Sequence, residues 1–170
     1  METREVDPIA EAYRQWQAHG WGEVADAMAM VTSLVRAHQL LQEQVDEVLK
    51  PMDLTFARFE VLRLLAFTRT GALPMTRLGS LLQVHPTSVT SAVDRLVAQG
   101  FVERLRREQD RRVVLASITD KGREVVERAT EGLNAEVFTE PGLTPRDLKT
   151  MNRLLGRIRA AQGDAVHPLR

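Results

Sequence analysis

The segment 84–112 constrains the fold more than any other part of this chain, and it reads VHPTSVTSAVDRLVAQGFVERLRREQDRR. Pro86 suits the first position of a helix because its φ is fixed, and Gly100 is typical of the residue that ends one. Between them, apolar residues recur at the spacing of one helical face; they are Val89, Ala92, Val93 and Leu96. The segment therefore predicts a short amphipathic helix with one face packed on a core.

The opposite face of this predicted helix is small and rich in hydroxyl groups. It carries Thr87, Ser88, Thr90, Ser91, Asp94 and Arg95. Serine and threonine are mediocre helix formers, so an exposed face built from them needs a reason. Such a face fits the DNA major groove, which is about 12 Å wide, and it offers hydrogen bonds to base edges and phosphates. We therefore predict DNA contacts from Thr87, Ser88, Thr90, Ser91 and Arg95.

A second short helix is predicted immediately upstream, over Met75–Leu82, after Pro74. The turn Gln83–His85 joins it to the hydroxyl-rich helix, and two short helices joined in this way form a helix-turn-helix. Gly79 in mid-helix costs roughly 1 kcal/mol relative to alanine, which a close helix crossing would explain. The alternative is a plain helical hairpin with a solvated Ser/Thr face.

Two strands are predicted after the helix pair. Phe101–Arg107 alternates in polarity and Arg112–Ile118 is rich in β-branched residues. Arginines flank the polar connection between them, so this ribbon is predicted to be a wing that reaches the minor groove. The candidate residues are Arg106, Arg107, Asp110, Arg111 and Arg112, with Asp110 orienting an arginine. An ordinary solvated hairpin tip is the alternative.

The stretch TSVTSAVDRLVAQGFVER, followed by DRR and SITDKG, resembles the winged-helix core of the MarR family of bacterial transcriptional regulators over residues 75–123. The resemblance implies a two-fold dimer that responds to small phenolic or other lipophilic ligands. It also implies that Asp110 orients Arg112 in the minor groove. The family's Leu-Thr-x-x-Gly appears here as Ile118, Thr119 and Gly122, a mild departure.

The fold class expected is mostly α with a small β-wing, in which a winged helix-turn-helix is flanked by terminal dimerisation helices. We expect one domain with dimerisation and pocket helices over 8–50, a DNA-binding core over 53–118 and dimerisation helices over 120–161. The tail Gln162–Arg170 is expected to be frayed. Apolar spacing predicts the flanking helices; they are Ala10–Ala18, Glu23–Leu49, Thr55–Thr68, Lys121–Phe138 and Pro145–Ala161.

Composition supports this interpretation. The chain has a net charge of zero, but residues 75–123 hold nine basic against five acidic residues, a net charge of +4 on the segment predicted to meet DNA. There is no cysteine, which excludes disulfides and thiol redox chemistry. The four histidines lack metal-ligand spacing and no catalytic motif occurs. We expect no enzyme activity, cofactor, metal or membrane span, and a cytoplasmic location.

Sequence analysis predicts a regulator that binds inverted-repeat double-stranded DNA as a homodimer, most simply a repressor released by a small aromatic or lipophilic effector. A constitutive DNA-binding protein and a winged-helix module for protein contacts remain as alternatives. His38 is either a core or interface histidine or a pocket residue, and Trp16 either caps the core or lines a pocket. The residues predicted to contact an effector are Trp16, Met28, Val31, His38 and Phe59.

Overall fold

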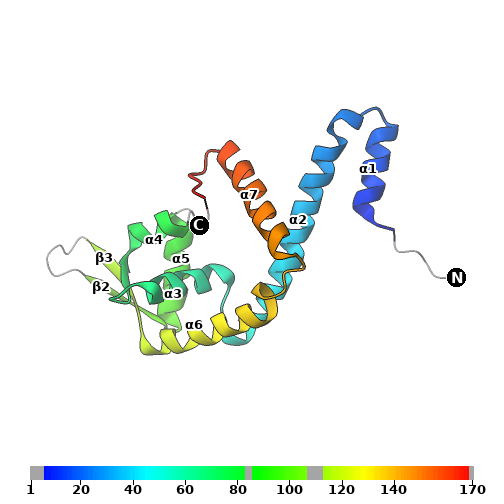
Figure 1. Cartoon of the computed structure of the whole chain (residues 1–170). Helices are drawn as coiled ribbons and strands as arrows, with labels where there is room; N and C mark the ends of the chain where they lie inside the picture. Colours follow the sequence, from blue (N-terminus) through cyan, green and yellow to red (C-terminus); the bar gives the residue numbers. More distant parts are fainter. Residues whose placement is uncertain (1–5, 83–85, 107–112, 169–170) are drawn as a thin grey trace.

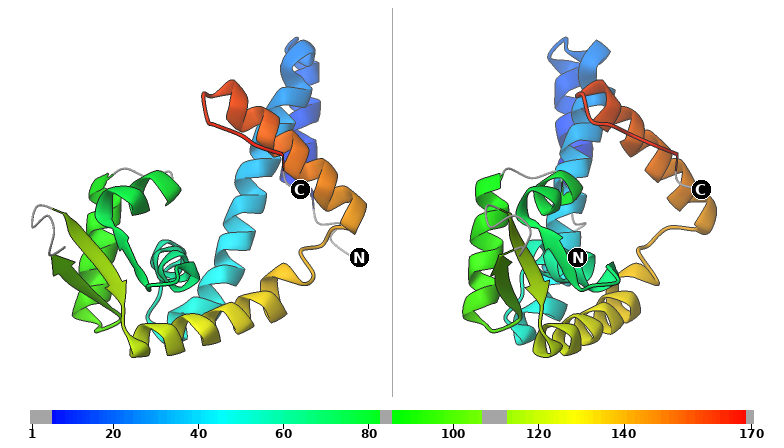
Figure 2. Two further views of the ribbon diagram at one scale, coloured as in Figure 1. Left: turned by 60° about the vertical axis from the view of Figure 1, so that its left-hand side comes forward. Right: turned by 90° about the vertical axis from the view of Figure 1, so that its left-hand side faces the viewer.

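The structure, a computed structural model, describes residues 6–82, 86–106 and 113–168 and has two distinct parts. One is a compact core of helices and a small sheet, and the other is a set of helices that project from it (Figure 1). The views in Figure 2 show the long helix α2 (Gly22–Leu49) running from the core to the far end of the molecule. This mostly helical architecture with a small sheet agrees with the predicted fold class.

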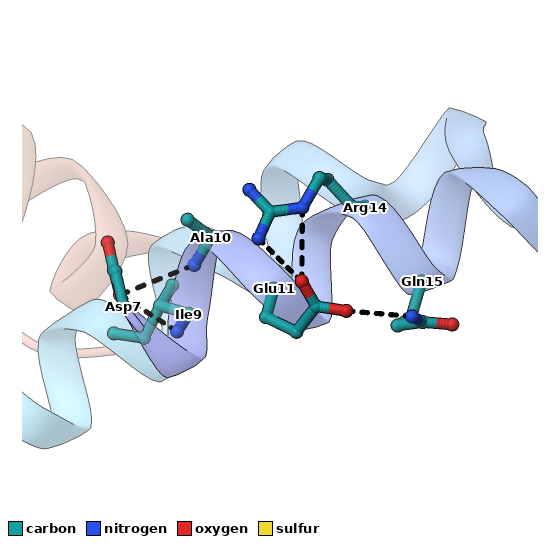
Figure 3. Close-up of polar contacts among 6 residues, drawn as sticks. All are labelled: Asp7, Ile9, Ala10, Glu11, Arg14 and Gln15. Atoms are coloured by element: carbon teal, nitrogen blue, oxygen red, sulfur yellow. Dashed lines mark hydrogen bonds and ion pairs between the residues drawn. The ribbon is translucent and has the colours of Figure 1, made fainter. Parts of the chain in front are cut away.

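Helix α1 (Pro8–Ala18) packs against the N-terminal half of α2 as a helical hairpin. Asp7 caps α1 by accepting hydrogen bonds from the backbone N–H groups of Ile9 and Ala10, as Figure 3 shows. Glu11 accepts hydrogen bonds from Arg14 and Gln15 on the next turn, and these bonds lower the pKa of the Glu11 carboxyl. Acidic side chains near a helix N-terminus also stabilise the helix, because they lie at the positive end of its dipole.

Three helices form the centre of the core. A 3₁₀ turn (Lys50–Met52) follows α2, and then α3 (Phe56–Phe67) begins at Thr55, whose side chain accepts from the Arg58 N–H. Helix α4 (Met75–Leu82) has the predicted bounds, and α5 (Pro86–Ala98) ends close to the predicted cap. Of the core-facing residues that the spacing of α5 predicted, Val89, Val93 and Leu96 are buried and Ala92 is half-buried.

The sheet has three antiparallel strands in the order β1-β3-β2. Strands β2 (Val102–Arg106) and β3 (Val114–Ile118) pair with Val102 opposite Ile118. Both are slightly shorter than predicted. Strand β1 (Ala72–Pro74) was not predicted; it pairs with β3, with Ala72 opposite Ser117.

Helix α6 (Asp120–Leu133) continues into a single π-helical turn (Asn134–Phe138). The predicted continuous helix over Lys121–Phe138 is therefore wrong in its last turn. Helix α7 (Pro145–Ala161) has the predicted bounds. After α7, residues 164–168 form neither helix nor strand and are exposed, although the Asp164 N–H donates to the Arg159 carbonyl. The expected fraying of the tail stays a prediction.

One hydrophobic cluster organises the molecule. Its members run from Val45 to Val137, so it contains the last turns of α2, the winged elements, α6 and the π turn. The N-terminal part of α2 and the helices α1 and α7 lie outside it. None of the helices in the described ranges is both long enough and apolar enough to cross a membrane.

Candidate nucleic-acid interface

Helix α5 presents the predicted hydroxyl-rich face to solvent. Thr87, Ser88, Thr90, Ser91 and Arg95 are all exposed, while Val89, Val93 and Leu96 on the other face are buried. The helix ends in a left-handed Gly100 with φ of 75°. The Phe101 N–H donates to the Leu96 carbonyl and the Gly100 N–H to the Val97 carbonyl, which is the hydrogen-bond pattern of a Schellman motif. The exposed face is thus held rigidly on the core.

Helix α4 crosses α5 beneath this face. Leu78 is fully buried at the crossing. A Cβ added at Gly79 would lie 3.9 Å from the Val89 Cγ2, an ordinary van der Waals distance. The crossing therefore does not require glycine, and the predicted reason for Gly79 is wrong. The predicted turn Gln83–His85 lies outside the described residues.

The described part of the wing carries Arg104 and Arg106, both exposed on β2. Arg107, Asp110, Arg111 and Arg112, including the Asp-x-Arg pattern, lie outside the described residues. An ion pair that sequence reasoning missed joins strand β2 of the wing to helix α5: the Arg104 Nη2 is 2.8 Å from the Asp94 Oδ1. Sequence spacing placed Asp94 on the outer face of the helix but gave no sign of its partner on the strand.

A tight junction holds α5, the wing and α6 together. The Thr119 hydroxyl donates to the Gly100 carbonyl at 2.8 Å and accepts from the Gly122 N–H, while the Lys121 ammonium donates to the Gln99 carbonyl at 2.9 Å. A Cβ added at Gly122 would lie 2.1 Å from the Phe101 carbonyl oxygen. Gly122 is therefore required by close backbone approach, which gives the Ile-Thr-x-x-Gly motif a physical reason.

A groove of about 800 Å³ opens beside the exposed face of α5. Its walls come from the turn before α3 and the first turn of α3 on one side and from α5 on the other. The polar and charged residues in its lining are Asp53, Thr55, Arg58, Thr87, Ser88, Ser91, Arg95 and Gln99. Four of the predicted DNA contacts thus line one groove, together with residues that sequence reasoning did not select.

The five predicted effector residues are not brought together in the single chain. Trp16 packs edge-on against Trp21 at the hairpin tip, with ring centroids 5.3 Å apart. Met28 is half-buried, whereas Val31 and His38 are exposed on α2, so His38 is not a core residue. Phe59 is buried in the core and reaches a second, smaller hollow of about 240 Å³ between α3 and α4.

The smaller hollow is largely apolar but contains Glu60 and Arg63. Burial raises the pKa of the Glu60 carboxyl. The Arg63 side chain is only 15% exposed. Its guanidinium donates to the Val126 carbonyl at 3.0 Å, to Thr130 and to both carboxylate oxygens of Glu127 at 3.1 Å, joining α3 to α6.

Within residues 6–82, 86–106 and 113–168, no group of three or more His, Cys, Asp or Glu side chains is placed to hold a metal ion. Apart from the single carboxylate of Asp53, the polar residues that line the groove beside α5 carry hydroxyl, amide and guanidinium groups. These are donors suited to phosphates and base edges.

Comparison with known proteins supports the same interpretation. The model of the MarR family matches residues 54–114. The Multiple antibiotic resistance protein MarR of Escherichia coli K12 is 30% identical over 116 residues, 67% of this chain and 79% of that protein. Sco5413, a MarR family transcriptional regulator from Streptomyces coelicolor, is 46% identical with a TM-score of 0.73 and matches 84% of this chain and 99% of its own.

One of the similar solved structures is a complex with DNA. Sco3205, a MarR family transcriptional regulator from Streptomyces coelicolor solved in complex with DNA, has a TM-score of 0.73 and 25% identity. The match covers 83% of this chain and 90% of that one.

Proposed function

Because this chain belongs to the MarR family of transcriptional regulators, we propose that it represses transcription as a homodimer on inverted-repeat DNA and is released by a small effector. The observation that carries the DNA-binding role is the exposed hydroxyl-rich face of α5, flanked by a wing and an arginine-containing groove. A relative of the same fold has been solved in complex with DNA. Failure to bind any duplex at low salt would favour the alternative, a winged-helix module for protein contacts.

A continuous apolar stripe on α2 supports the homodimer. Val45, Val48 and Leu49 at its C-terminal end are buried in the chain's own core. The same stripe continues toward the N-terminus through residues that a single chain leaves exposed; they are Val24, Met30, Val31, Leu34, Val35 and Leu41. Helix α7 has no buried residue and exposes Met151, Leu154 and Ile158. Contiguous apolar surface of this kind is typical of an isologous interface between identical chains.

The hollow beside Phe59 supports the proposed effector. The hollow beside Phe59 is largely apolar and contains a half-buried carboxyl group, a combination that suits a small aromatic or lipophilic molecule. Trp16, Met28, Val31 and His38 lie on the hairpin helices, and they would join such a site only through the second chain of a dimer. A ligand acts as an effector if it binds the DNA-competent and incompetent states with different affinity.

Selection from random duplexes tests the DNA-binding proposal. The purified protein should enrich inverted repeats whose half-sites are about one helical turn, roughly 34–36 Å, apart. Ser91→Ala should change base preference by about 1–3 kcal/mol at one position per half-site. Ser33→Ala, which removes a hydroxyl from exposed α2, is the matched control. A protein that enriches no duplex at low salt would contradict DNA binding.

Tryptophan fluorescence with a panel of aromatic acids, measured beside operator binding, tests the effector. The proposal expects quenching together with loss of DNA affinity, and expects Trp16→Phe or His38→Ala to weaken both responses. A compound that releases DNA equally well from both variants would place sensing elsewhere. Operator affinity that no compound changes would favour the constitutive DNA-binding protein.

A further inference from the structure

Arg58, at the start of α3, is a largely buried arginine that lines the groove beside α5. Its side chain is only 16% exposed, although it lines the open groove beside α5. The Arg58 Nε donates to the Thr55 hydroxyl at 3.3 Å and the Nη1 donates to the Gln99 side-chain oxygen at 3.2 Å. A guanidinium has five N–H donors, so three of them have no hydrogen-bond partner among the described residues.

The residues around Arg58 fix its direction without neutralising it. The nearest carboxylate is Asp53, whose Oδ1 lies 3.9 Å from the Arg58 Nη2, the long limit of an ion pair. The other carboxylate oxygen of Asp53 accepts from the Gln99 amide at 2.8 Å, and the same amide donates to the Asp53 carbonyl at 2.7 Å. Gln99 therefore holds both Asp53 and Arg58, and it keeps the planar guanidinium in one orientation at the groove.

The position of the groove identifies what it can receive. A helix of about 10–12 Å diameter fills a major groove of about 12 Å, so the sugar-phosphate strands run along both of its sides. The Arg58 groove is such a side of α5, and Arg95 and Ser91 of the recognition helix form part of its wall. An arginine donates to phosphate through parallel, charge-assisted hydrogen bonds.

We propose that the Arg58 groove seats one DNA backbone strand beside the major groove, with the Arg58 guanidinium as a phosphate-binding group that Gln99 and Thr55 orient. The inference rests on the proposed DNA binding and adds a contact to it that lies on neither the recognition helix nor the wing. Contacts of this kind set the register of a protein on the duplex and carry no direct base information.

Binding across a range of salt concentrations gives the first test. The proteins are the full-length chain, Arg58→Gln and the control Arg128→Gln, which removes the same charge from the exposed face of α6. Arg58→Gln should weaken binding about tenfold on the selected operator and on random duplex alike. It should also lower the slope of log K against log salt by about one. Arg128→Gln should leave the slope unchanged.

A phosphate scan separates a DNA contact from a structural role. Neutral methylphosphonates are placed one at a time along the operator strand. In the unaltered protein, one position in each half-site should weaken binding, and in Arg58→Gln the same position should have no further effect. Arg58→Lys keeps the charge and should retain sensitivity at that position, which covers the case in which Arg58→Gln folds poorly.

Several results would overturn the inference. If the unaltered protein binds duplex but no phosphate position distinguishes it from Arg58→Gln and Arg58→Lys, the groove does not bind the backbone and the proposed function stands without it. If inorganic phosphate raises the unfolding temperature in an Arg58-dependent way beyond chloride of equal ionic strength, while no phosphate position on the duplex depends on Arg58, the groove is a site for free anions instead. Failure of the unaltered protein to bind any duplex would overturn both proposals.

Discussion

The winged core and the projecting helices differ in how their apolar side chains are covered. The core, from Val45 to Val137, covers its own apolar residues: Leu62, Leu65 and Leu96 are fully buried by neighbours in the same chain. The helices α1 and α7 have no buried residue, and the N-terminal half of α2 leaves a row of valines and leucines in contact with solvent.

This difference shows where one chain is sufficient and where it is not. Burying apolar surface contributes roughly 25 cal/mol per Å², and the core obtains this stabilisation from its own residues. The projecting helices can obtain it only from another surface. The core should therefore unfold with a stability that does not depend on protein concentration, whereas the order of the helices should depend on it.

The largest expected effect comes from placing a charge on the exposed stripe of α2. Val35→Glu should leave the winged core folded but disrupt the proposed dimer, because an unpaired carboxylate in an apolar interface costs about 3–5 kcal/mol, or roughly a thousandfold in association. Sedimentation at micromolar concentration should detect the change from dimer to monomer.

Ser33→Glu provides the matched control for this substitution. It adds the same charge two residues away, at an exposed position about 160° around the helix from Val35. It should leave the dimer intact. Equal dissociation in both variants would show that any charge added to α2 weakens association, wherever it lies on the helix. The apolar stripe would then not be the interface between the two chains.

A smaller effect is expected within the core, at two glycines of α6. Gly122→Ala should destabilise the chain by about 1–3 kcal/mol, because the added methyl meets a backbone carbonyl that cannot move aside. Gly132→Ala meets only the Val48 Cγ1, at 2.8 Å, and gains about 1 kcal/mol of helix propensity, so its net change should be much smaller. Chemical denaturation of both variants measures the difference. Equal stabilities would mean that the junction at Phe101 is more adaptable than its geometry indicates.

The smallest effects concern two carboxyls of the core that should respond to pH in opposite directions. Burial raises the pKa of Glu60, so the folded state holds this proton more tightly and ionisation lowers stability as the pH rises through the folded pKa. Hydrogen bonds from Arg63 lower the pKa of Glu127, so its contribution is present at neutral pH and is lost as the pH falls through the folded pKa.

Replacing each carboxyl by its amide tests these signs. At neutral pH, Glu60→Gln should raise the unfolding free energy and Glu127→Gln should lower it, each by less than about 1 kcal/mol because neither group is deeply buried. The Glu60 difference should fade as the pH falls through the ordinary glutamate range, whereas the Glu127 difference should persist until the pH falls through the lowered folded pKa of Glu127. A Glu60→Gln variant that is less stable than the unaltered protein at neutral pH would mean that the ionised carboxyl has a partner.

Local sequence signals predicted much of the winged core. The period of the apolar residues and a proline at or just before the first helical position were sufficient for α4, α5 and α7, and Gly100 marked the end of α5, because these signals depend on neighbours within one or two turns. Strand β1 was missed because it has only three residues and ends at Pro74, which is too short for an alternating pattern. Its existence depends on pairing with β3, more than forty positions further along the chain.

The site was predicted in part for the same reason. The exposed face of α5 follows from helical period alone, but the Arg58 groove depends on Gln99, forty-one positions away. For the proposed effector residues on α2, the helical period indicated that they share one face of the helix. It did not show that they lie too far apart along the helix to meet in one site. Met28 and His38 are ten residues apart, about 15 Å along α2, and Phe59 belongs to another helix. The π turn after α6 likewise has no local sequence signal that we can identify.

The length of α2 has a mechanical consequence. This helix is anchored in the core by Val48 and Leu49 and continues unbroken for 28 residues, about 42 Å, to the aromatic tip at Trp21. It is therefore a lever with its fulcrum inside the winged core: a tilt of roughly 10° at the anchored end displaces the free end by about 7 Å. Any contact that restrains the free arm restrains the angle at which the recognition helix is presented.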